Sequence, residues 1–318
     1  MLVVPTPVGH SEDDGRDAVA FAGAYRLALD PWQSLTCETW MRRDRRGRWC
    51  AGTWGITVPR QNGKNGILEA VELYGMVVLG LRFLHTAHEV KTARKAFLRL
   101  LGFFDNPRDF PDLAAMVKEI RRTNGQEAIL LHNGASIEFV ARSKGSGRGF
   151  TVDVLVLDEA QDLREEELEA LKPTISAAPS GDPVTIFMGT PPTDDALREG
   201  GKGEPFARTR ATVLGVKPKR IAWVEFSLDV DLVKLSDEQI AAIAADRKGW
   251  YRTNPALGRR INVQTIEDEL TAFSPRAFCK ERLNIWPAPQ SSKATLALSS
   301  DLWRDLALTV VPSSWPLA

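Results

Sequence analysis

The chain has 318 residues, enough for one large hydrophobic core or two moderate ones. Hydrophobic residues make up 43% of it and charged residues 26%, a balance typical of a globular protein rather than a disordered or fibrous one. The formal net charge is zero, so the chain as a whole has no basic field that would attract a nucleic acid.

Basic residues gather only locally, and each cluster is either a solvated surface or a track for phosphates. These clusters are Arg42–Arg48, Lys91–Arg99, Lys118–Arg122 and Lys217–Arg220. The three cysteines show no C-x-x-C spacing, so we expect a reducing compartment and no disulfide framework. No apolar run is long enough to span a membrane, and the N-terminus lacks a basic-then-apolar signal segment, which favours a cytosolic protein.

Along the chain, apolar runs typical of strands alternate with helical patterns, after a polar stretch over residues 1–20 that we expect to be a loose lead-in. The expected strands are Thr53–Thr57, Arg82–Ala87, Ala128–Leu131, Ser136–Val140, Val152–Leu157, Val184–Met188 and Ala222–Phe226. The expected helices are Lys64–Leu79, Val90–Leu101, Leu168–Ile175 and Asp237–Asp246. This alternation predicts an α/β fold with a mostly parallel sheet covered by helices on both faces.

Two features modify this simple alternation. Asn133–Gly134 lies between two apolar runs, and because both residues tolerate positive φ it predicts a hairpin, which we place at an edge of the sheet. After about Lys217 one strand is followed by helical segments and an aromatic-rich stretch that ends at Trp286. The composition of Pro287–Lys293 is that of a linker, and residues 294–318 are too few to form a domain.

The segment Val58–Asn65, V-P-R-Q-N-G-K-N, joins an expected strand to an expected helix. A Gly-Lys at such a junction is where a phosphate-binding loop would place it, with backbone amides facing the anion and Lys64 reaching the outer phosphates. Val58 stands where such loops usually begin with glycine, and Asn65 stands where they usually have Ser or Thr. Taken alone, the segment is equally well explained as a polar turn capping a helix.

A second signal is Val154–Glu159, V-L-V-L-D-E, in which an apolar strand ends in two carboxylates. Ligands of open α/β sheets bind at this edge, where Asp158 would hold Mg²⁺ and Glu159 would orient and deprotonate a water molecule. The alternative is an Asp-Glu helix cap after a core strand. The presence of Lys64 on another strand–helix junction of the same sheet favours the catalytic interpretation.

Arg148 lies in the glycine-rich run Ser143–Gly149, just before the carboxylate strand. It is either part of a solvated loop or an arginine finger, which would stabilise the charge that develops on a γ-phosphate. Arg142 and Lys144 are weaker candidates for the same role.

Two further positions are candidates for nucleotide contacts. Thr190, in Gly189–Pro192, follows the strand expected beside the carboxylate strand and would sense the γ-phosphate, although a Pro-terminated turn explains the segment equally well. Gln33, at the end of Leu29–Gln33 (L-D-P-W-Q), carries a side-chain amide that is able to bond both edges of an adenine. His85 and His88 have H-x-x-H spacing, but no third ligand accompanies them, so we do not expect a zinc site.

In order, the motifs read L-D-P-W-Q, V-P-R-Q-N-G-K-N, S-G-R-G, V-L-V-L-D-E-A and G-T-P-P. The set resembles the large terminase subunit of tailed bacteriophages, the ATP-driven motor that packages DNA into procapsids. The resemblance extends to Asn254–Gly258 and Phe278–Trp286, and so covers roughly residues 25–290.

The resemblance implies a P-loop NTPase of the ASCE (RecA-like) class, with an ATPase core in residues 1–216 and a small lid subdomain in residues 217–290. Residues 291–318 would be a linker towards the C-terminal nuclease of that family, a domain that this chain lacks, so no nuclease activity is expected. Arg60 matches an arginine that the family often carries before its Gly-Lys, and Arg148 would act in trans on a neighbour in a ring. Thr190 would be the coupling residue. The expected ATP ligands are Gln33, Arg60, Gln61, Asn62, Gly63, Lys64, Asn65 and Thr190, with Asp158 and Asn65 on Mg²⁺.

The resemblance also implies the partners, which are double-stranded DNA, the portal protein, the small terminase subunit and further copies of the chain in a pentameric ring. The expected location is the cytoplasm of the bacterial host, outside the virion. Two alternatives stay open: a helicase-type ATPase, since D-E-A-Q-D also occurs in strand-separating enzymes, and an inactive prophage remnant that serves as a binding module.

Overall fold

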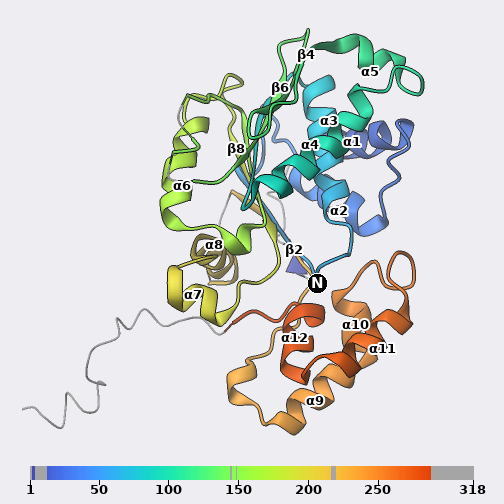
Figure 1. The fold of residues 1–318 in the computed structure, drawn as a ribbon, viewed down its shortest axis with the longest axis vertical. Helices are drawn as coiled ribbons and strands as arrows, with labels where there is room; N and C mark the ends of the chain where they lie inside the picture. Colours follow the sequence, from blue (N-terminus) through green and yellow to red (C-terminus); the bar gives the residue numbers. More distant parts are fainter. Residues whose placement is uncertain (1, 4–12, 144, 148, 216–219, 288–318) are drawn as a thin grey trace, which may run out of the picture. The chain divides into compact units, whose positions relative to one another are not determined.

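A mostly parallel sheet of nine strands organises the part of the chain that the computed structural model describes, residues 2–3, 13–143, 145–147, 149–215 and 220–287 (Figure 1). From one edge to the other the strands are β1 (Leu2–Val3), β9 (Ile221–Glu225), β2 (Thr53–Thr57), β8 (Val184–Gly189), β7 (Val154–Asp158), β3 (Arg82–Ala87), β6 (Ser136–Ala141), β5 (Glu127–Leu131) and β4 (Val117–Arg121). Neighbouring strands from β9 to β6 are parallel, while β1, β5 and β4 pair antiparallel at the two edges.

Helices cover both faces of this sheet, as the alternation in the sequence predicts (Figure 1). One face carries α1 (Asp13–Ala24), α2 (Pro31–Trp40), α3 (Asn65–Val77), α4 (Val90–Phe104) and α5 (Pro111–Met116). The other face carries α6 (Glu165–Leu171) and α8 (Glu204–Gly215), with α7 (Asp194–Gly200) just before α8. A further helical segment contains α9 (Asp237–Ala245), α10 (Arg247–Thr253), α11 (Val263–Ala272) and α12 (Pro275–Leu283).

The period-two geometry of a strand explains how one sheet supports two hydrophobic cores. In β7, Val154 and Val156 face the core under α1–α4, while Leu155 and Leu157 face the core under α6 and α8. A strand buried on both faces therefore reads as a continuous apolar run, which is the pattern by which β7 can be found in the sequence.

The expected strands are all present, with ends shifted by no more than two residues, and so are three of the four expected helices. The fourth, Leu168–Ile175, is only partly an α-helix, because α6 ends at Leu171 and a 3₁₀ helix follows over Lys172–Ile175. The hairpin is also confirmed: β5 and β6 are antiparallel, Gly134 has a φ of 91°, and the Asn133 side chain accepts a hydrogen bond from the amide of Ala135 at 3.0 Å. It lies one strand in from the edge, because β4 pairs outside it. β4 escapes the sequence analysis because an edge strand exposes charged residues and so lacks an apolar run.

The expectation of a loose lead-in over residues 1–20 is wrong for its second half. Helix α1 begins at Asp13, and its Ala18 and Ala22 are fully buried in the core shared with α2 and α3. Small apolar residues spaced four apart make this buried stripe, but the glycines and charges of the segment hide it from a pattern based on large side chains.

The helical segment after the sheet has a hydrophobic core of its own, built around Trp250, Ile266, Phe278 and Leu283. Strand β9 precedes this core and belongs to the sheet, so the separate packing starts after Glu225 rather than at residue 217. The division into ATPase core and lid stays a prediction, and the expected linker falls almost wholly outside the described residues. No helix among the described residues is long and apolar enough to cross a membrane. The three cysteines are free and buried.

Candidate nucleotide site

The loop Val58–Lys64 connects β2 to the N-terminus of α3 near the centre of the sheet. It turns sharply because Gly63 has a φ of 91°, and Gln61 adopts a φ of 66°, a conformation that costs a non-glycine residue free energy. Lys64 is the residue before the first turn of α3, the helix end at which the dipole favours an anion, although the amides of Gly66 and Ile67 are bonded to the carbonyl oxygens of Gly63 and Lys64. The loop thus brings a glycine with positive φ and a lysine to the N-terminus of a helix.

Gln33 of α2 stabilises this loop by hydrogen bonding. Its Nε2 donates to the carbonyl oxygen of Gly63 at 2.6 Å, and its Oε1 accepts from the amide of Asp30 at 2.6 Å. The side chain is 1% exposed, so both ends of the amide are committed to backbone groups in this structure. Gln33 would be able to hydrogen-bond an adenine only if these two bonds to the backbone were broken.

A pocket opens beside the loop, which we call the loop pocket. Its lining consists of Leu27, Ala28, Leu29, Gln33, Gln61, Gly63, Lys64, Asn65, Gly66, Glu69 and Arg260. Apolar side chains before α2 form one side and the start of α3 forms the other, which suits a base and a phosphate chain respectively. Arg260, from the helical segment, reaches over to Asp30 with an Nε to Oδ2 distance of 2.8 Å.

The two carboxylates lie at the carboxyl end of β7, separated from β2 by the single strand β8. Because β2, β8 and β7 are parallel and in register, their ends meet at one edge of the sheet. The positive charge of Lys64 acts to lower the pKa of both Asp158 and Glu159, so the three predicted residues lie within electrostatic range of one another.

Asp158 is 2% exposed and yet is kept ionised. Burial alone would raise the pKa of its carboxyl group, but the neighbouring His85 and the charge of Lys64 outweigh burial and hold the pKa below its ordinary value. The Oδ1 atom accepts the amide of Glu159 at 2.8 Å. Asp158 is therefore a hard anionic oxygen donor of the kind that Mg²⁺ prefers.

Glu159 differs from Asp158 in both exposure and charge. It is half-buried, and burial together with the charge of Asp158 raises the pKa of its carboxyl group. A raised pKa makes a carboxylate a better proton acceptor, as a general base requires. Its backbone adopts φ 52° and ψ 50°, a left-handed conformation that a glutamate holds only when its surroundings enforce it.

Arg142 helps to hold the backbone of Glu159 in this conformation. Its guanidinium is buried and donates to the carbonyl oxygens of Asp158 and Glu159, the latter at 2.9 Å, and to that of Thr86 at 3.3 Å. The side chain is thus occupied in holding the backbone that carries both carboxylates. The suggestion that Arg142 is an alternative arginine finger does not fit this position. The first choice for that role, Arg148, and the other alternative, Lys144, lie outside the described residues.

His85 of β3 is buried against the same carboxylate. Its Nδ1 lies 2.6 Å from Oε1 of Glu72 in α3, and its Nε2 lies 3.9 Å from Oδ2 of Asp158, too far for a hydrogen bond but close enough for charge attraction. Burial lowers the pKa of His85, but the charges of Glu72 and Asp158 outweigh it and raise the pKa to about 9. The residue is a cation between two buried carboxylates.

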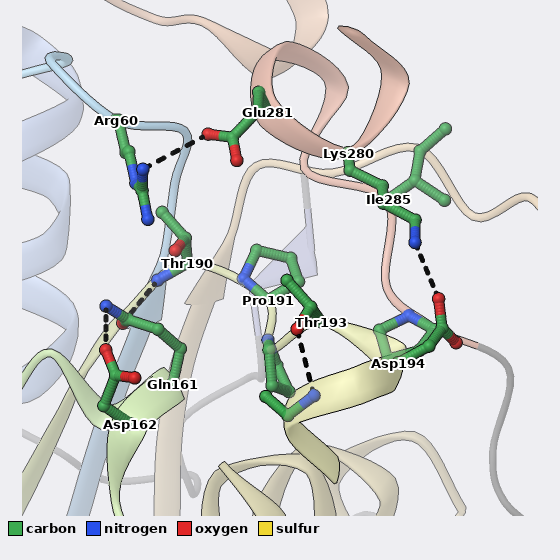
Figure 2. Close-up of a pocket in the computed structure, with 13 residues that line it drawn as sticks. Arg60, Gln161, Asp162, Thr190, Pro191, Thr193, Asp194, Lys280, Glu281 and Ile285 are labelled. Atoms are coloured by element: carbon green, nitrogen blue, oxygen red, sulfur yellow. Dashed lines mark hydrogen bonds and ion pairs between the residues drawn. The ribbon is translucent and has the colours of Figure 1, made fainter. Parts of the chain in front are cut away.

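The remaining predicted ligands face away from the loop pocket. Arg60 and Thr190 line a second pocket, at the end of β8, which we call the strand-end pocket (Figure 2). Arg60 is exposed and pairs with Glu281 at 3.7 Å, while the Thr190 amide donates to the side chain of Gln161 at 3.2 Å. Asn62 is buried, with its side chain turned towards the helical segment.

The Asp158 carboxylate at the sheet edge and the side-chain oxygen of Asn65 at the start of α3 are hard oxygen donors of the kind that a divalent cation prefers. Among the described residues no group of three or more His, Cys, Asp or Glu side chains is arranged to hold a metal by itself. A cation at this edge would therefore share its coordination with phosphate oxygens and water, as Mg²⁺ does at phosphate sites.

Four residues support the site from a distance; the sequence analysis named Arg142 and His85 only for other roles and did not name Glu72 or Arg282. Glu72 and His85 carry the clearest signal, a charged residue within an apolar helix pattern and an imidazole within an apolar strand. Arg142 and the helical-segment residue Arg282 carry no comparable signal, because a surface arginine and a buried one look alike in a single sequence.

Among solved structures, the fold is similar to that of the large terminase of bacteriophage HK97, with a TM-score of 0.64 and 17% sequence identity over 85% of this chain. This chain covers 55% of the HK97 protein, about half its length. The large terminase of a thermophilic bacteriophage, solved in complex with ADP, matches 74% of this chain and 48% of that chain, with a TM-score of 0.47 and 11% identity. The ATPase domain of the Thermus phage P74-26 large terminase matches 55% of this chain and 69% of that domain, with a TM-score of 0.41 and 18% identity.

At these identities the likeness establishes the fold, and only the HK97 match is close enough to support an argument. The described part of the chain has the α/β fold of a phage large terminase, as the resemblance of the motifs implies. No protein-family model and no curated protein sequence matches the chain.

Proposed function

We propose that this chain is the ATPase motor part of a phage large terminase, which hydrolyses P–O bonds of ATP to move double-stranded DNA into procapsids. The observation that carries the proposal is the meeting of Lys64, Asp158 and Glu159 at one edge of the sheet, after β2 and β7. This is the arrangement that a water-attacking phosphoryl transfer needs, with a cation for the phosphates, a metal ligand and a base.

In the proposed reaction ATP occupies the loop pocket, with its phosphates on the amides of Gly63 and Lys64 and on the Lys64 ammonium group. Mg²⁺ held by Asp158, with Asn65 assisting, would neutralise charge on the phosphate oxygens. Glu159 accepts the proton of the attacking water, and Arg142 holds the Glu159 backbone so that its carboxylate points to that water.

We assign Arg60 and Thr190 to the strand-end pocket as candidates for contact with the terminal phosphate or with a neighbouring copy. Gln33, Gln61 and Asn62 would act mainly on the shape of the loop. Arg148 would be supplied to the site of a neighbour in a ring, as the pentameric assembly of this family implies. As part of the same proposal, the chain would work with the portal protein and the small terminase subunit in the cytoplasm of the bacterial host.

Nucleotide binding tests the first half of the proposal. Lys64→Ala should weaken the affinity for an ATP analogue by about tenfold or more, because a charge-assisted contact to phosphate is lost. Lys95→Ala, which removes an exposed lysine from α4, is the matched control and should bind like the wild type. Equal affinities for the three proteins would refute the assignment of the loop pocket.

A mixing assay tests the shared site. The chain with Glu159→Gln and the chain with Arg148→Ala should each have little ATPase activity alone, and a mixture should recover activity where one copy supplies the arginine and the other the base. If the mixture stays inactive although each mutant binds nucleotide and assembles, the arginine acts in cis or another residue has its role.

DNA unwinding distinguishes the helicase alternative. The described residues form one mostly parallel sheet, whereas strand-separating ATPases of that kind need a second RecA-like domain to complete their site. We therefore expect ATP turnover on double-stranded DNA without strand separation.

A further inference from the structure

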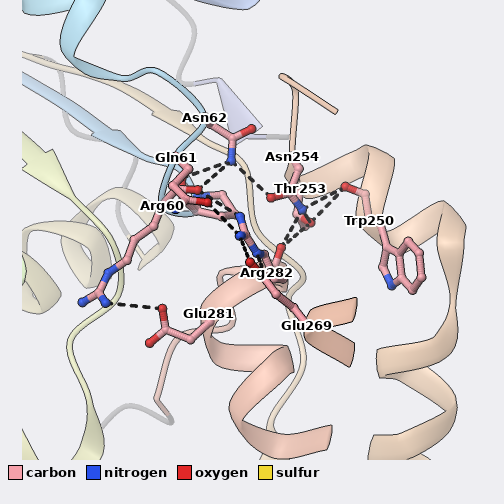
Figure 3. Close-up of polar contacts among 10 residues, drawn as sticks. Arg60, Gln61, Asn62, Trp250, Thr253, Asn254, Glu269, Glu281 and Arg282 are labelled. Carbon is pink, nitrogen blue, oxygen red and sulfur yellow. Dashed lines mark hydrogen bonds and ion pairs between the residues drawn. The ribbon is translucent and has the colours of Figure 1, made fainter. Parts of the chain in front are cut away.

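The phosphate loop is held from outside the sheet, by a buried arginine of the helical segment (Figure 3). Arg282 of α12 donates through Nη1 to the carbonyl oxygen of Arg60 at 3.2 Å and through Nη2 to Oε1 of Gln61 at 3.0 Å. It lies more than 220 positions away in the chain from the loop it contacts. With 4% of its surface exposed, it cannot be a solvated surface arginine.

Arg282 is itself fixed on two sides. Its guanidinium forms a forked pair with the carboxylate of Glu269 in α11. Its carbonyl oxygen accepts from Nδ2 of Asn254 at 2.7 Å and from the hydroxyl group of Thr253 at 3.0 Å, at the end of α10. The end of α10 therefore fixes the backbone of Arg282, and α11 fixes its guanidinium. A planar fork held in this way can align more than one acceptor at once.

A second connection lies beside the first. Nδ2 of Asn62 donates to Oδ1 of Asn254 at 3.1 Å, and Oδ1 of Asn62 accepts the amide of Ala256 at 3.0 Å. Asn254 thus contacts both the loop, at the Asn62 side chain, and the backbone carbonyl oxygen of Arg282 (Figure 3). The loop residues Arg60, Gln61 and Asn62 are all bonded to the helical segment, immediately before the Gly63–Lys64 pair.

We infer that Arg282 is a positioning residue for phosphate binding, which holds the first half of the loop in the strained course that presents the amides of Gly63 and Lys64. Gln61 is held at a φ of 66°, and its side chain is the acceptor that Arg282 engages. Such a conformation relaxes unless outside bonds enforce it. We call the bonds from Arg282 to Arg60 and Gln61 the clamp. That the loop binds phosphate rests on the proposed function, whereas the clamp itself rests only on these contacts.

The clamp has a consequence for regulation. Because the bonds of Arg282 join loop and helical segment, any ligand that shifts the segment changes the shape of the loop, and nucleotide binding shifts the segment in return. A partner that binds α10, α11 or α12 would change nucleotide affinity without touching the nucleotide.

The test compares two arginines that each fork onto a carboxylate, the buried Arg282 and the partly buried Arg210, of which only Arg282 contacts the loop. Arg282→Lys keeps a positive charge next to Glu269 but loses the fork, so it cannot hold Arg60 and Gln61 together. Arg210→Lys is the matched control, because Arg210 forks onto buried Glu225 with distances of 2.7 to 3.0 Å and does not contact the loop. A third protein, Gln61→Ala, removes one acceptor from the loop side.

Two quantities are measured on each protein. The first is hydrogen exchange of the amides of residues 58–66 without nucleotide, and the second is the dissociation constant for an ATP analogue. We expect Arg282→Lys to raise the exchange rate of the loop amides by about tenfold and the dissociation constant by about tenfold. Gln61→Ala should change both quantities in the same direction but by less. Arg210→Lys should leave both within about twofold of the wild type, whatever it does to the melting temperature.

The clamp is refuted if loop exchange in Arg282→Lys matches that in Arg210→Lys, or if Gln61→Ala exchanges like the wild type. If the wild type binds no nucleotide, the proposed function fails, while the exchange measurement still decides the clamp. If exchange rises but affinity does not change, the bonds are structural only and the inference is wrong.

Discussion

The buried ion cluster of Glu72, His85 and Asp158 makes protein stability depend on pH in a window where few other groups titrate. In the folded chain His85 lies between two carboxylates that are each 2% exposed. Its ordinary pKa of 6.5 rises to about 9, chiefly because the charges of Glu72 and then Asp158 overcome the effect of burial. The unfolded chain has no such cluster.

The direction of the pH dependence follows from the fact that His85 binds its proton more tightly in the folded state than in the unfolded state. A folded pKa above the unfolded value stabilises the protein while both states are protonated, so the contribution is complete below pH 6.5 and is lost as the pH rises through about 9. At about 1.4 kcal/mol for each pH unit between the two pKa values, the loss amounts to about 3 kcal/mol. For a domain of ordinary stability this is a large fraction of the free energy of unfolding.

Urea denaturation of the wild type at a series of pH values between 6 and 9 measures this loss. The comparison protein replaces His85 and Glu72 together with glutamine, which removes the charges without leaving the α3 carboxylate unpaired, and should show a flatter profile. His132→Gln removes an exposed imidazole and should follow the wild type. A flat wild-type profile, or an equally steep one in the double mutant, would refute the reasoning.

Three further outcomes follow from the site and the core. Arg142→Met should lower ATP turnover by at least about tenfold while nucleotide affinity stays within about twofold, since Arg142 holds the Glu159 backbone but does not line the loop pocket. A parallel loss of affinity would contradict this role. Phe206→Ala should cost about 3–5 kcal/mol of unfolding free energy, because Phe206 is fully buried in the core under α6 and α8. Phe273→Ala, at a side chain 40% exposed, should cost about 1 kcal/mol or less, and equal losses would show that the core is misassigned.

The sequence identifies the fold wherever a structural rule is local. Strand β7 is a continuous apolar run up to its final aspartate, and α4 has a clear amphipathic period, so their positions follow from a few residues each. Helix α1 is missed because its buried stripe consists of small residues, and β4 because an edge strand has no apolar run.

The candidate site divides in the same way. Lys64, Asp158 and Glu159 are predictable because each follows a recognisable strand, and the parallel order of the strands brings the ends together. The contact between Asn62 and Asn254 joins positions 192 residues apart, and no local pattern contains it. For the same reason the sequence does not predict that Gln33 braces the loop or that Arg60 turns to Glu281.

The central claim is that Glu159 removes a proton from water during ATP hydrolysis, and one measurement tests it most directly. Phosphate release is followed for the wild type and Glu159→Gln with Mg²⁺, double-stranded DNA and saturating ATP, after nucleotide binding by both has been established. We expect release by the wild type and a rate at least about a hundredfold lower in the mutant, the usual size of a general-base contribution. Equal rates of release in the two proteins would contradict the account.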